Sequence, residues 1–535
     1  MKNNRERIFS DLSRLTCNDF QFASGTGTGW ICVEYELDEF SGKGLATGAC
    51  SRTEEIVLDL KLEGWHKLYI AFNPEIRVWL DGDNGYYQME ASPHDIRDYF
   101  CFEADFTGKK LHIAPVRSSV RNKELTVFYI RAVQSERKNS KKNLIATNDG
   151  HCLFWDGIDS IRDLYRYLLP LKNTDFFRMV WGLYGGGLLS TGDSKVADKI
   201  PWSDENCFYE RQWVFNRSLK GILEKGDDPL VAVRDITEEI GLELHFYFRV
   251  GAFYWPFPLH GRTSSFYLSH PEWHCVDEYG NRVKRISYAF RQVQDVICEY
   301  FQEIIDRYDP DGLCLAFNRG LPLMICEKPV IEEFERVYGR KPVLPEQVDS
   351  PEMLKIRHKL LAEFVERVYR MTSSKGKALS CIVPRDFDRN LLFGLDIEML
   401  VKKGFFESVL VGAGHKDQPQ LNLNLEPVLR LKRCGTKIYP GGSGVNAHGG
   451  AWKPEDLLAR ATFMAKILDM GFDGAYFWDV DQIVDSTTEW EILGNFGTVD
   501  ILNGIIEGRL PTIKYHETKR IYDLRVDRYN PWNAY

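Results

Sequence analysis

The sequence predicts an α/β protein, a (β/α)8 TIM barrel preceded by an antiparallel β-sandwich accessory domain. Three observations predict it. Short apolar strands alternate with helical segments from about residue 150 to 483, and polar residues follow these strands at their carboxyl ends. In the first 140 residues, apolar and polar residues instead alternate at every second position.

The predicted sandwich comprises residues 1–140. Its strands show the period-two pattern of a sheet with one buried face, and turns such as Asp81-Gly-Asp-Asn-Gly separate them. The domain is either a carbohydrate-binding module or a structural wedge without a ligand. The polar segment 134–148 is interpreted as a linker. The predicted strands are Trp30–Leu37, Glu55–Leu62, His66–Phe72, Glu75–Leu80, Lys110–Pro115 and Leu125–Val133.

The barrel is placed at residues 149–483, and its fourth unit is the clearest. A helix over Val293–Arg307 ends at Pro310-Asp-Gly, and the buried strand Leu313–Phe317 follows. The count of eight, without Gly-x-Gly-x-x-Gly after the first strand, favours a closed barrel over a doubly wound sheet. A C-terminal extension, 484–535, is expected to pack back on the barrel or sandwich. The eight predicted strands are His151–Trp155, Phe176–Leu183, Leu242–Phe248, Leu313–Phe317, Ala378–Val383, Glu407–Val411, Lys437–Tyr439 and Gly474–Trp478.

Composition excludes several classes of partner. The 535 residues are 44% hydrophobic and 27% charged, as in a soluble globular protein, and the net charge of −9 argues against nucleic acid. The N-terminus has no apolar segment and no later run suits a membrane span. We therefore expect a cytoplasmic protein without a membrane partner, unless a signal peptide was removed. The twelve cysteines lack zinc spacing, so free thiols, no metal and no cofactor are expected. A homo-oligomer is left open.

The strand ends and neighbouring loops supply residues suited to a sugar site. Aromatic rings stack on sugar rings, planar polar groups bind hydroxyls, and paired carboxylates cleave glycosidic bonds. Alternatively, Asp156 caps a helix and His270 is a loop histidine. The predicted substrate-binding residues are Trp155, Asp156, Trp181, Tyr184, Arg249, Trp255, His270, Asn318, Arg319, Tyr439, Trp478 and Asp481.

Two carboxylates are assigned to the chemistry. Asp479 follows the apolar Tyr476-Phe-Trp, and apolar surroundings raise the pKa of a carboxyl group, so it is the candidate general acid. Asp386 lies beside Arg385, and a cation favours the ionised form, so it is the candidate nucleophile or base. We expect Asp156, Arg249, position 316, Asp386 and Asp479 all to open onto one cavity at the carboxyl ends of the strands.

Several segments resemble the family-10-like glycosyl hydrolases, a glycosyl hydrolase-like TIM-barrel group. The resemblance covers roughly residues 176–478 and implies a glycosidase-like barrel that acts on carbohydrate. The segments are His270-Pro-Glu-Trp, Tyr288-Ala-Phe, Tyr308-Asp-Pro-Asp-Gly, Arg319, Gly394-Leu-Asp-Ile-Glu-Met-Leu-Val-Lys-Lys-Gly and Gly471-Phe-Asp-Gly-Ala-Tyr-Phe.

The chain departs from this resemblance at two places. Relatives carry a carboxylate in strand four where this chain has Ala316, and they end strand eight in Phe-Asn-Trp where it has Phe477-Trp-Asp. Three interpretations remain: the carboxylates are rearranged toward Asp479, the chain is inactive, or Ala316 is a substitution that traps substrate. Position 316 is therefore kept among the catalytic positions.

The sequence thus predicts a glycoside hydrolase that cleaves an oligosaccharide or glycoside by carboxylate acid/base chemistry. Its predicted partner is a carbohydrate substrate. The alternatives are a non-catalytic carbohydrate-binding barrel and a sugar isomerase or lyase.

Overall fold

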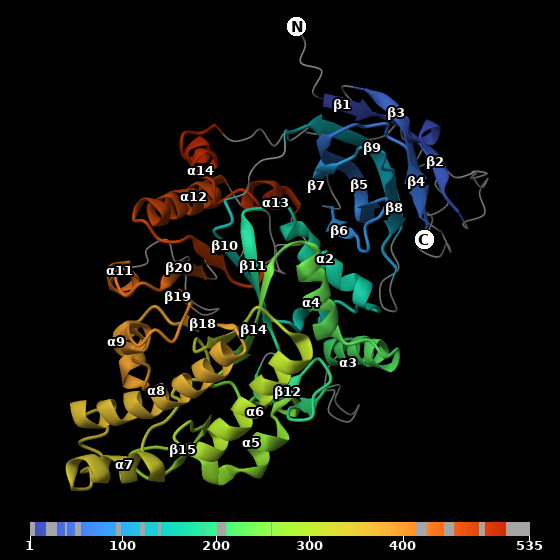
Figure 1. Ribbon diagram of the computed structural model, residues 1–535. Helices are drawn as coiled ribbons and strands as arrows, with labels where there is room; N and C mark the ends of the chain where they lie inside the picture. Colours follow the sequence, from blue (N-terminus) through green and yellow to red (C-terminus); the bar gives the residue numbers. More distant parts are fainter. Residues whose placement is uncertain are drawn as a thin grey trace.

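The computed structural model contains an antiparallel sheet module and a closed barrel that lie side by side (Figure 1). No helix among the described residues is both long and apolar enough to cross a bilayer. The structure describes residues 6–17, 29–37, 40–48, 55–91, 98–117, 124–136, 141–184, 186–200, 210–257, 259–413, 425–442, 454–480 and 487–509.

The N-terminal module is antiparallel, as predicted, but its two halves share one strand. Within the described residues it is a nine-stranded sheet. The first half of β5 pairs with β7 and β9, and its second half pairs with β6 and β8. The sequence pattern predicts two strands here, separated at Asn73-Pro74, whereas the structure has one. The strands are β1 (Glu6–Phe9), β2 (Ile31–Glu36), β3 (Ser41–Thr47), β4 (Ile56–Leu58), β5 (Trp65–Leu80), β6 (Tyr87–Glu90), β7 (Asp98–Asp105), β8 (Leu111–Pro115) and β9 (Leu125–Gln134).

The predicted closed barrel is confirmed. Eight parallel strands of the described chain close on themselves, because the first pairs with both the second and the last. The strands are β10 (Leu144–Asn148), β11 (Phe176–Gly182), β14 (Glu243–Arg249), β17 (Gly312–Ala316), β18 (Ala378–Val383), β19 (Ser408–Ala413), β20 (Lys437–Gly442) and β21 (Ala475–Phe477).

The first barrel strand was predicted wrongly. His151–Trp155 does not form a strand: the structure has a short helix, α1 (Cys152–Trp155), there, and the strand is β10, within the segment interpreted as a linker. β10 is only five residues long and follows a run of lysines and polar residues, so its own pattern is weak. Its partners β11 and β21 bury it fully. Asp149, rather than Trp155, therefore follows the carboxyl end of strand one.

Helices precede most barrel strands and cover the outside of the barrel (Figure 1). Two short strand pairs, β12 (Leu189–Ser190) with β13 (Asp198–Lys199) and β15 (His274–Val276) with β16 (Arg282–Ile286), lie in the insertions after β11 and β14. The other helices are α2 (Tyr165–Leu168), α3 (Glu210–Glu224), α4 (Pro229–Glu239), α5 (Ser265–Ser269), α6 (Arg291–Tyr308), α7 (Lys328–Tyr338), α8 (Pro351–Ser374), α9 (Phe387–Leu392), α10 (Ile397–Lys402), α11 (Glu426–Lys432), α12 (Pro454–Asp469), α13 (Thr487–Leu493) and α14 (Val499–Ile506).

Two layers of core position the site. The larger cluster of buried side chains includes strand residues that pack against the surrounding helices, such as Phe246 and Phe248 on β14. The alternate residue Tyr247 belongs to a smaller cluster in the barrel interior, as expected from the alternation of side chains along a strand. This interior cluster consists of Ile145, Val180, Tyr247, Cys314, Ala316, Ile382, Leu410, Tyr439, Tyr476 and Trp478.

Candidate active site

An aspartate that the sequence analysis did not select lies at the centre of the barrel mouth. Asp149 directly follows β10, and one of its carboxylate oxygens accepts hydrogen bonds from the Tyr247 hydroxyl and the Arg249 guanidinium. Both donors project from β14, two residues apart. The Asp149 side chain is 6% exposed and that of Arg249 is 1% exposed, so this is a buried ion pair.

The surroundings keep Asp149 ionised. Burial alone would raise the pKa of Asp149, but the charges of Arg249, His151 and Arg319 and the Tyr247 hydrogen bond hold it well below its usual range. Burial and the Asp149 charge together raise the pKa of Tyr247, which therefore remains a protonated donor. Asp149 is consequently a fixed anion at the carboxyl end of strand one.

Asp479 supplies a second buried carboxylate close to the first. It follows β21, the neighbour of β10, and it is 1% exposed. Its backbone N–H donates to Thr147 Oγ1 over 3.0 Å, and its φ is +52°. A non-glycine residue in the left-handed region costs energy, and such residues cluster at functional sites. The negative charge of Asp479 contributes to raising the pKa of both Tyr247 and Arg249.

Asn318 and Arg319 follow β17 and carry buried hydrogen-bonding groups. Asn318 Oδ1 and Nδ2, and Arg319 Nη2, are buried without a hydrogen-bond partner in the described part of the chain. Arg319 lies within electrostatic range of Asp149, Tyr247 and Asp479. Since buried polar groups are normally satisfied, these atoms are suited to contact a ligand.

The backbone next to Arg319 is held by two glycines. Gly320 has a φ of +79°, and a Cβ atom placed there would lie 2.1 Å from the backbone carbon of Gly251. The loops after β14 and β17 therefore touch through their backbones, which only glycine permits at this separation. This contact fixes Arg319 relative to Arg249.

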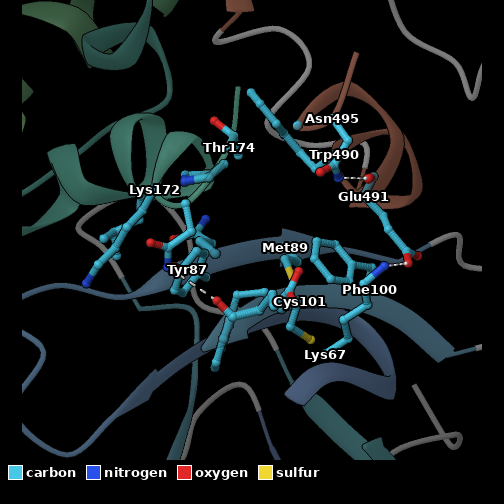
Figure 2. A pocket seen from close by; sticks show the side chains of 17 residues that line it. Lys67, Tyr87, Met89, Phe100, Cys101, Lys172, Thr174, Trp490, Glu491 and Asn495 are labelled. Atoms are coloured by element: carbon cyan, nitrogen blue, oxygen red, sulfur yellow. Dashed lines mark hydrogen bonds and ion pairs between the residues drawn. The ribbon is translucent and has the colours of Figure 1, made fainter. Parts of the chain in front are cut away.

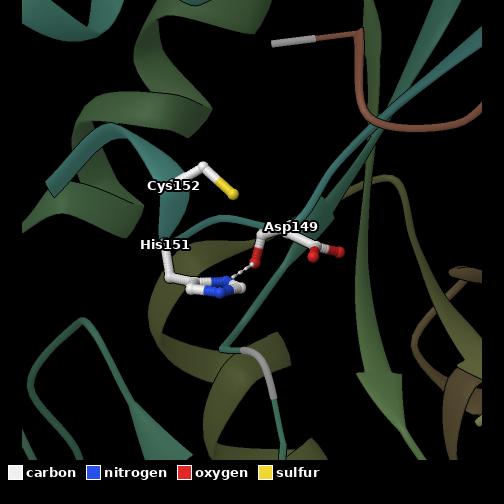
Figure 3. A group of neighbouring side chains, drawn as sticks. All are labelled: Asp149, His151 and Cys152. Carbon is white, nitrogen blue, oxygen red and sulfur yellow. Dashed lines mark hydrogen bonds between the residues drawn. The ribbon is translucent and has the colours of Figure 1, made fainter. Parts of the chain in front are cut away.

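One cluster has the residue types of a metal site (Figure 3). One donor atom from each of Asp149, His151 and Cys152 lies within 4.8 Å of the others. His151 Nδ1 hydrogen-bonds to the Asp149 backbone oxygen over 3.0 Å, and burial lowers the pKa of His151 to about 4. The Asp149 carboxylate, however, is already paired with the Arg249 cation, which would repel a metal ion. The cluster therefore does not fit a metal.

Several predicted substrate-binding residues lie in the loops around this pair. The Arg262 guanidinium lies 4.4 Å from the ring centre of Trp155 and 5.6 Å from that of Trp255. The Tyr184 ring packs against His151, with 5.3 Å between ring centres. Trp478 lies inside the barrel, 6.0 Å from Tyr247.

The structure does not bring the other predicted residues to the Asp149–Arg249 pair. Trp181 belongs to the cluster between barrel and helices, and Tyr439 packs inside the barrel beside Phe177. The Asp156 carboxylate accepts a 2.7 Å hydrogen bond from the Tyr167 hydroxyl. His270 stacks on its neighbour Trp273, with 3.7 Å between ring centres, and its Nδ1 lies 2.9 Å from Glu272.

The two remaining catalytic positions differ from expectation. Asp386 is exposed and caps α9, because its Oδ1 accepts a 3.0 Å hydrogen bond from the backbone N–H of Arg389. Ala316 is fully buried inside the barrel. Asp481 lies outside the described residues.

Sequence reasoning missed Asp149, Tyr247 and His151 as members of one site. The available signal for Asp149 was its position before Gly150, three residues after the end of the apolar run Leu144–Ala146. Gly150 has a φ of +72°, and a Cβ atom there would lie 1.8 Å from the Gly182 oxygen. A required glycine after a short apolar run marks the end of a barrel strand.

No protein-family model matches the chain, and no curated protein does. Among solved structures, it is similar to alpha-L-fucosidase isoenzyme 2 from Paenibacillus thiaminolyticus, with a TM-score of 0.42 and 15% identity over 67% of this chain and 49% of that chain. It thus spans about half of the fucosidase. The PgaB (BpsB) glycoside hydrolase domain from Bordetella bronchiseptica gives a TM-score of 0.42 and 12% identity over 66% of this chain and 98% of that chain.

A GH36 alpha-galactosidase from Geobacillus stearothermophilus is also similar, with a TM-score of 0.37 and 10% identity over 94% of this chain and 73% of that chain. These proteins are glycoside hydrolases, but the similarity is too low to assign a family or an activity to the chain. It does not support the family-10-like resemblance.

Proposed function

We propose that the chain is a glycoside hydrolase that cleaves an O-glycosidic bond with Asp149 and Asp479 as its two carboxylates. One observation carries the proposal: two buried carboxylates follow adjacent strands at the barrel mouth and share Tyr247 and Arg249 as neighbours. Glycosidic cleavage needs one carboxyl group that donates a proton and one that is ionised. The active sites of TIM barrels lie at this end of the strands.

The two carboxylates have different surroundings, as this chemistry requires. Asp149 is held ionised by Arg249 and serves as nucleophile or base. It takes the role first assigned to Asp386, whose exposed carboxylate caps a helix. Asp479 is assigned the proton-donating role because it stands, itself buried, between the fully buried Trp478 and Val480, and burial disfavours the ionised form of a carboxyl group.

The neighbouring polar and aromatic groups would orient the sugar. Arg319 and Asn318 present unpartnered hydrogen-bonding atoms within the described region, and Trp478 offers a ring beside Tyr247. Trp155, the last residue of α1, and Trp255, on the loop after β14, both pack against the Arg262 guanidinium. Rings of this kind stack on the C–H faces of a sugar.

The test is a panel of chromogenic glycosides and natural glycans with the parent protein, Asp479→Asn and Asp149→Asn. We expect each variant to lose turnover by about 10²- to 10⁴-fold, because each removes a group that moves a proton or holds charge in the transition state. Circular dichroism and melting curves must show that the variants fold. Asp386→Asn is the matched control and should retain the parent rate. Equal turnover by parent and Asp479→Asn would refute the proposal.

A second candidate function, a non-catalytic carbohydrate-binding barrel, is favoured by Ala316. This aliphatic residue occupies the end of strand four, where the resemblance implies a carboxylate. Glycan binding by calorimetry, with no turnover of any glycoside and no effect of Asp479→Asn on affinity, would support this alternative.

A further inference from the structure

The buried groups without a partner at the barrel mouth are mainly hydrogen-bond donors. With the Asp479 carboxylate set aside, the buried atoms without a partner among the described residues at the ends of β10, β17 and β21 are Asn148 Nδ2, Asn318 Nδ2, Asn318 Oδ1, Arg319 Nη2 and Trp478 Nε1. Amide nitrogens, guanidinium nitrogens and the indole nitrogen only donate, and Asn318 Oδ1 is the one acceptor in this set. A ligand that satisfies these groups must be rich in acceptors.

The charges in the same place are unequal. Arg249 is paired with Asp149. Arg319 forms no ion pair with a described residue: burial and the nearby Arg249 lower the pKa of Arg319, and the charges of Asp149 and Asp479 offset this only in part. Arg262 is a further cation, close enough to contribute to lowering the pKa of His151. Within the described residues, the mouth therefore holds three arginines against the carboxylates of Asp149 and Asp479.

Trp478 and Arg319, which carry two of these donors, both have Tyr247 as a neighbour. Trp478 packs 6.0 Å from Tyr247, and Arg319 lies within electrostatic range of the same Tyr247. Asn318 precedes Arg319 in the chain, and the contact between Gly251 and Gly320 prevents this segment from moving away from β14. Arg319 is thus a half-buried side chain whose buried Nη2 has no hydrogen-bond partner among the residues that the structure describes.

We propose that the substrate is an acidic sugar, a uronic acid whose carboxylate binds Arg319, with Asn318 Nδ2 and Trp478 Nε1 as further donors. This inference rests on the proposed function and names its substrate class. A carboxylate offers two oxygens in the plane that a guanidinium fork matches, and charge-assisted hydrogen bonds are the strong ones. A neutral sugar would leave the Arg319 nitrogen without an anion, which penalises its binding in a buried site.

The experiment compares pairs of sugars that differ only at C6. Each sugar is titrated separately into the Asp479→Asn protein by calorimetry; the pairs are glucuronate and glucose, and galacturonate and galactose. In a second assay, the parent protein is given the matching 4-nitrophenyl uronides and glycosides as substrates. We expect a preference of about 10- to 100-fold for the acidic member of a pair. Arg319→Gln should reduce this ratio to near one, and Arg319→Lys should restore part of it. Arg389→Gln, which removes an exposed cation of α9, should retain the parent ratio.

The binding measurement separates this inference from the proposed function. Acidic sugars that bind through Arg319 without being cleaved would support the inference and contradict the hydrolase assignment. Equal affinity for both members of each pair, a preference for the neutral member, or a preference that survives in Arg319→Gln would overturn the inference. Binding of none of the four sugars would also overturn it.

Discussion

Asp149 and Arg249 lie 100 residues apart in the chain and form an ion pair inside the barrel mouth. The strands β10 and β14 that carry them are separated by β11, so the pair crosses the barrel interior rather than linking adjacent strands. The attraction between buried charges offsets a large desolvation cost only while both partners are present. The pair therefore couples the stability of the barrel to the charge state of its site.

Removing the cation should destabilise the protein strongly. Arg249→Met keeps much of the side-chain volume but leaves the buried Asp149 carboxylate without its charge partner. We expect the free energy of unfolding at neutral pH to fall by about 3–5 kcal/mol, measured by urea denaturation. Lys220→Gln is the control: its ion pair with Glu224 has side chains that are 63% and 67% exposed, so a change below about 1 kcal/mol is expected. Equal stability of Arg249→Met and the parent would contradict the interpretation.

His151 should make stability depend on pH. Burial lowers the pKa of His151 from 6.5 to about 4 in the folded protein. Between these values the unfolded chain takes up a proton that the folded chain does not, so stability is complete above pH 6.5 and falls as the pH is lowered to 4. The loss from this one group is on the order of 3 kcal/mol, with no further loss below pH 4.

The measurement compares the parent with His151→Asn between pH 7 and pH 4. The asparagine amide can still donate to the Asp149 backbone oxygen, but it does not titrate. The difference in unfolding free energy between the two proteins should therefore shrink as the pH falls. His270→Asn, at a half-buried loop position, provides the control. A difference that stays constant across this range would show that His151 is not buried in its neutral form.

Most of the barrel was predictable because its strands carry their own signal. The strand Leu313–Phe317 is apolar throughout, ends in polar residues and follows a well-marked helix, and the structure places β17 there. β10 lacks these features: a polar segment precedes it, and it ends in Thr147 and Asn148. Its strand conformation comes from the two neighbours that close the barrel, which no local pattern reveals.

The site was predicted less well than the fold, for the same reason. Because strand one was predicted at His151–Trp155 instead of Leu144–Asn148, Asp156 was selected as the carboxylate at its end in place of Asp149. Arg249 was selected correctly as a residue with an anionic neighbour, but that neighbour is distant in sequence. Asp386 was selected although it is not in this site. An aspartate after a strand can be either an active-site residue or a helix cap, and the hydrogen bond from the Arg389 N–H shows that Asp386 is a helix cap.

Glu491 of α13 forms one of the polar contacts to the sheet module. Its carboxylate accepts hydrogen bonds from Lys67 Nζ over 2.5 Å and from the Tyr69 hydroxyl over 2.7 Å, both on β5. Figure 2 shows Glu491 and Lys67 among the side chains that line a groove between the two parts. The Glu491 side chain is 12% exposed, so its loss leaves two polar groups poorly satisfied.

Glu491→Ala should therefore weaken the junction between the two parts. We expect calorimetric melting to separate into two transitions, with the sheet module unfolding first, and a loss of about 2–4 kcal/mol for the first step. Glu332→Ala removes an exposed glutamate that pairs with Lys328 and should leave the melting profile unchanged. A single transition at the parent temperature for Glu491→Ala would show that other contacts, such as the Arg77–Asp163 ion pair, suffice to hold the junction.

Ala316→Asp tests whether strand four lacks a catalytic carboxylate or has no place for one. Ala316 is fully buried and lies opposite Arg249 in the pairing of β14 with β17, so a new carboxylate would compete with Asp149 for the same guanidinium. Burial raises the pKa of such a carboxyl group, because the ionised form loses its hydration. This destabilisation arises only when the group is ionised, so the loss of stability should grow as the pH rises toward 7. We expect about 2–4 kcal/mol at pH 7, less at pH 5, and no gain in turnover. Ala316→Asn has nearly the same volume without the charge, so its deficit should not depend on pH. A gain of turnover in Ala316→Asp, absent in Ala316→Asn, would instead mean that position 316 is where the site requires a carboxylate.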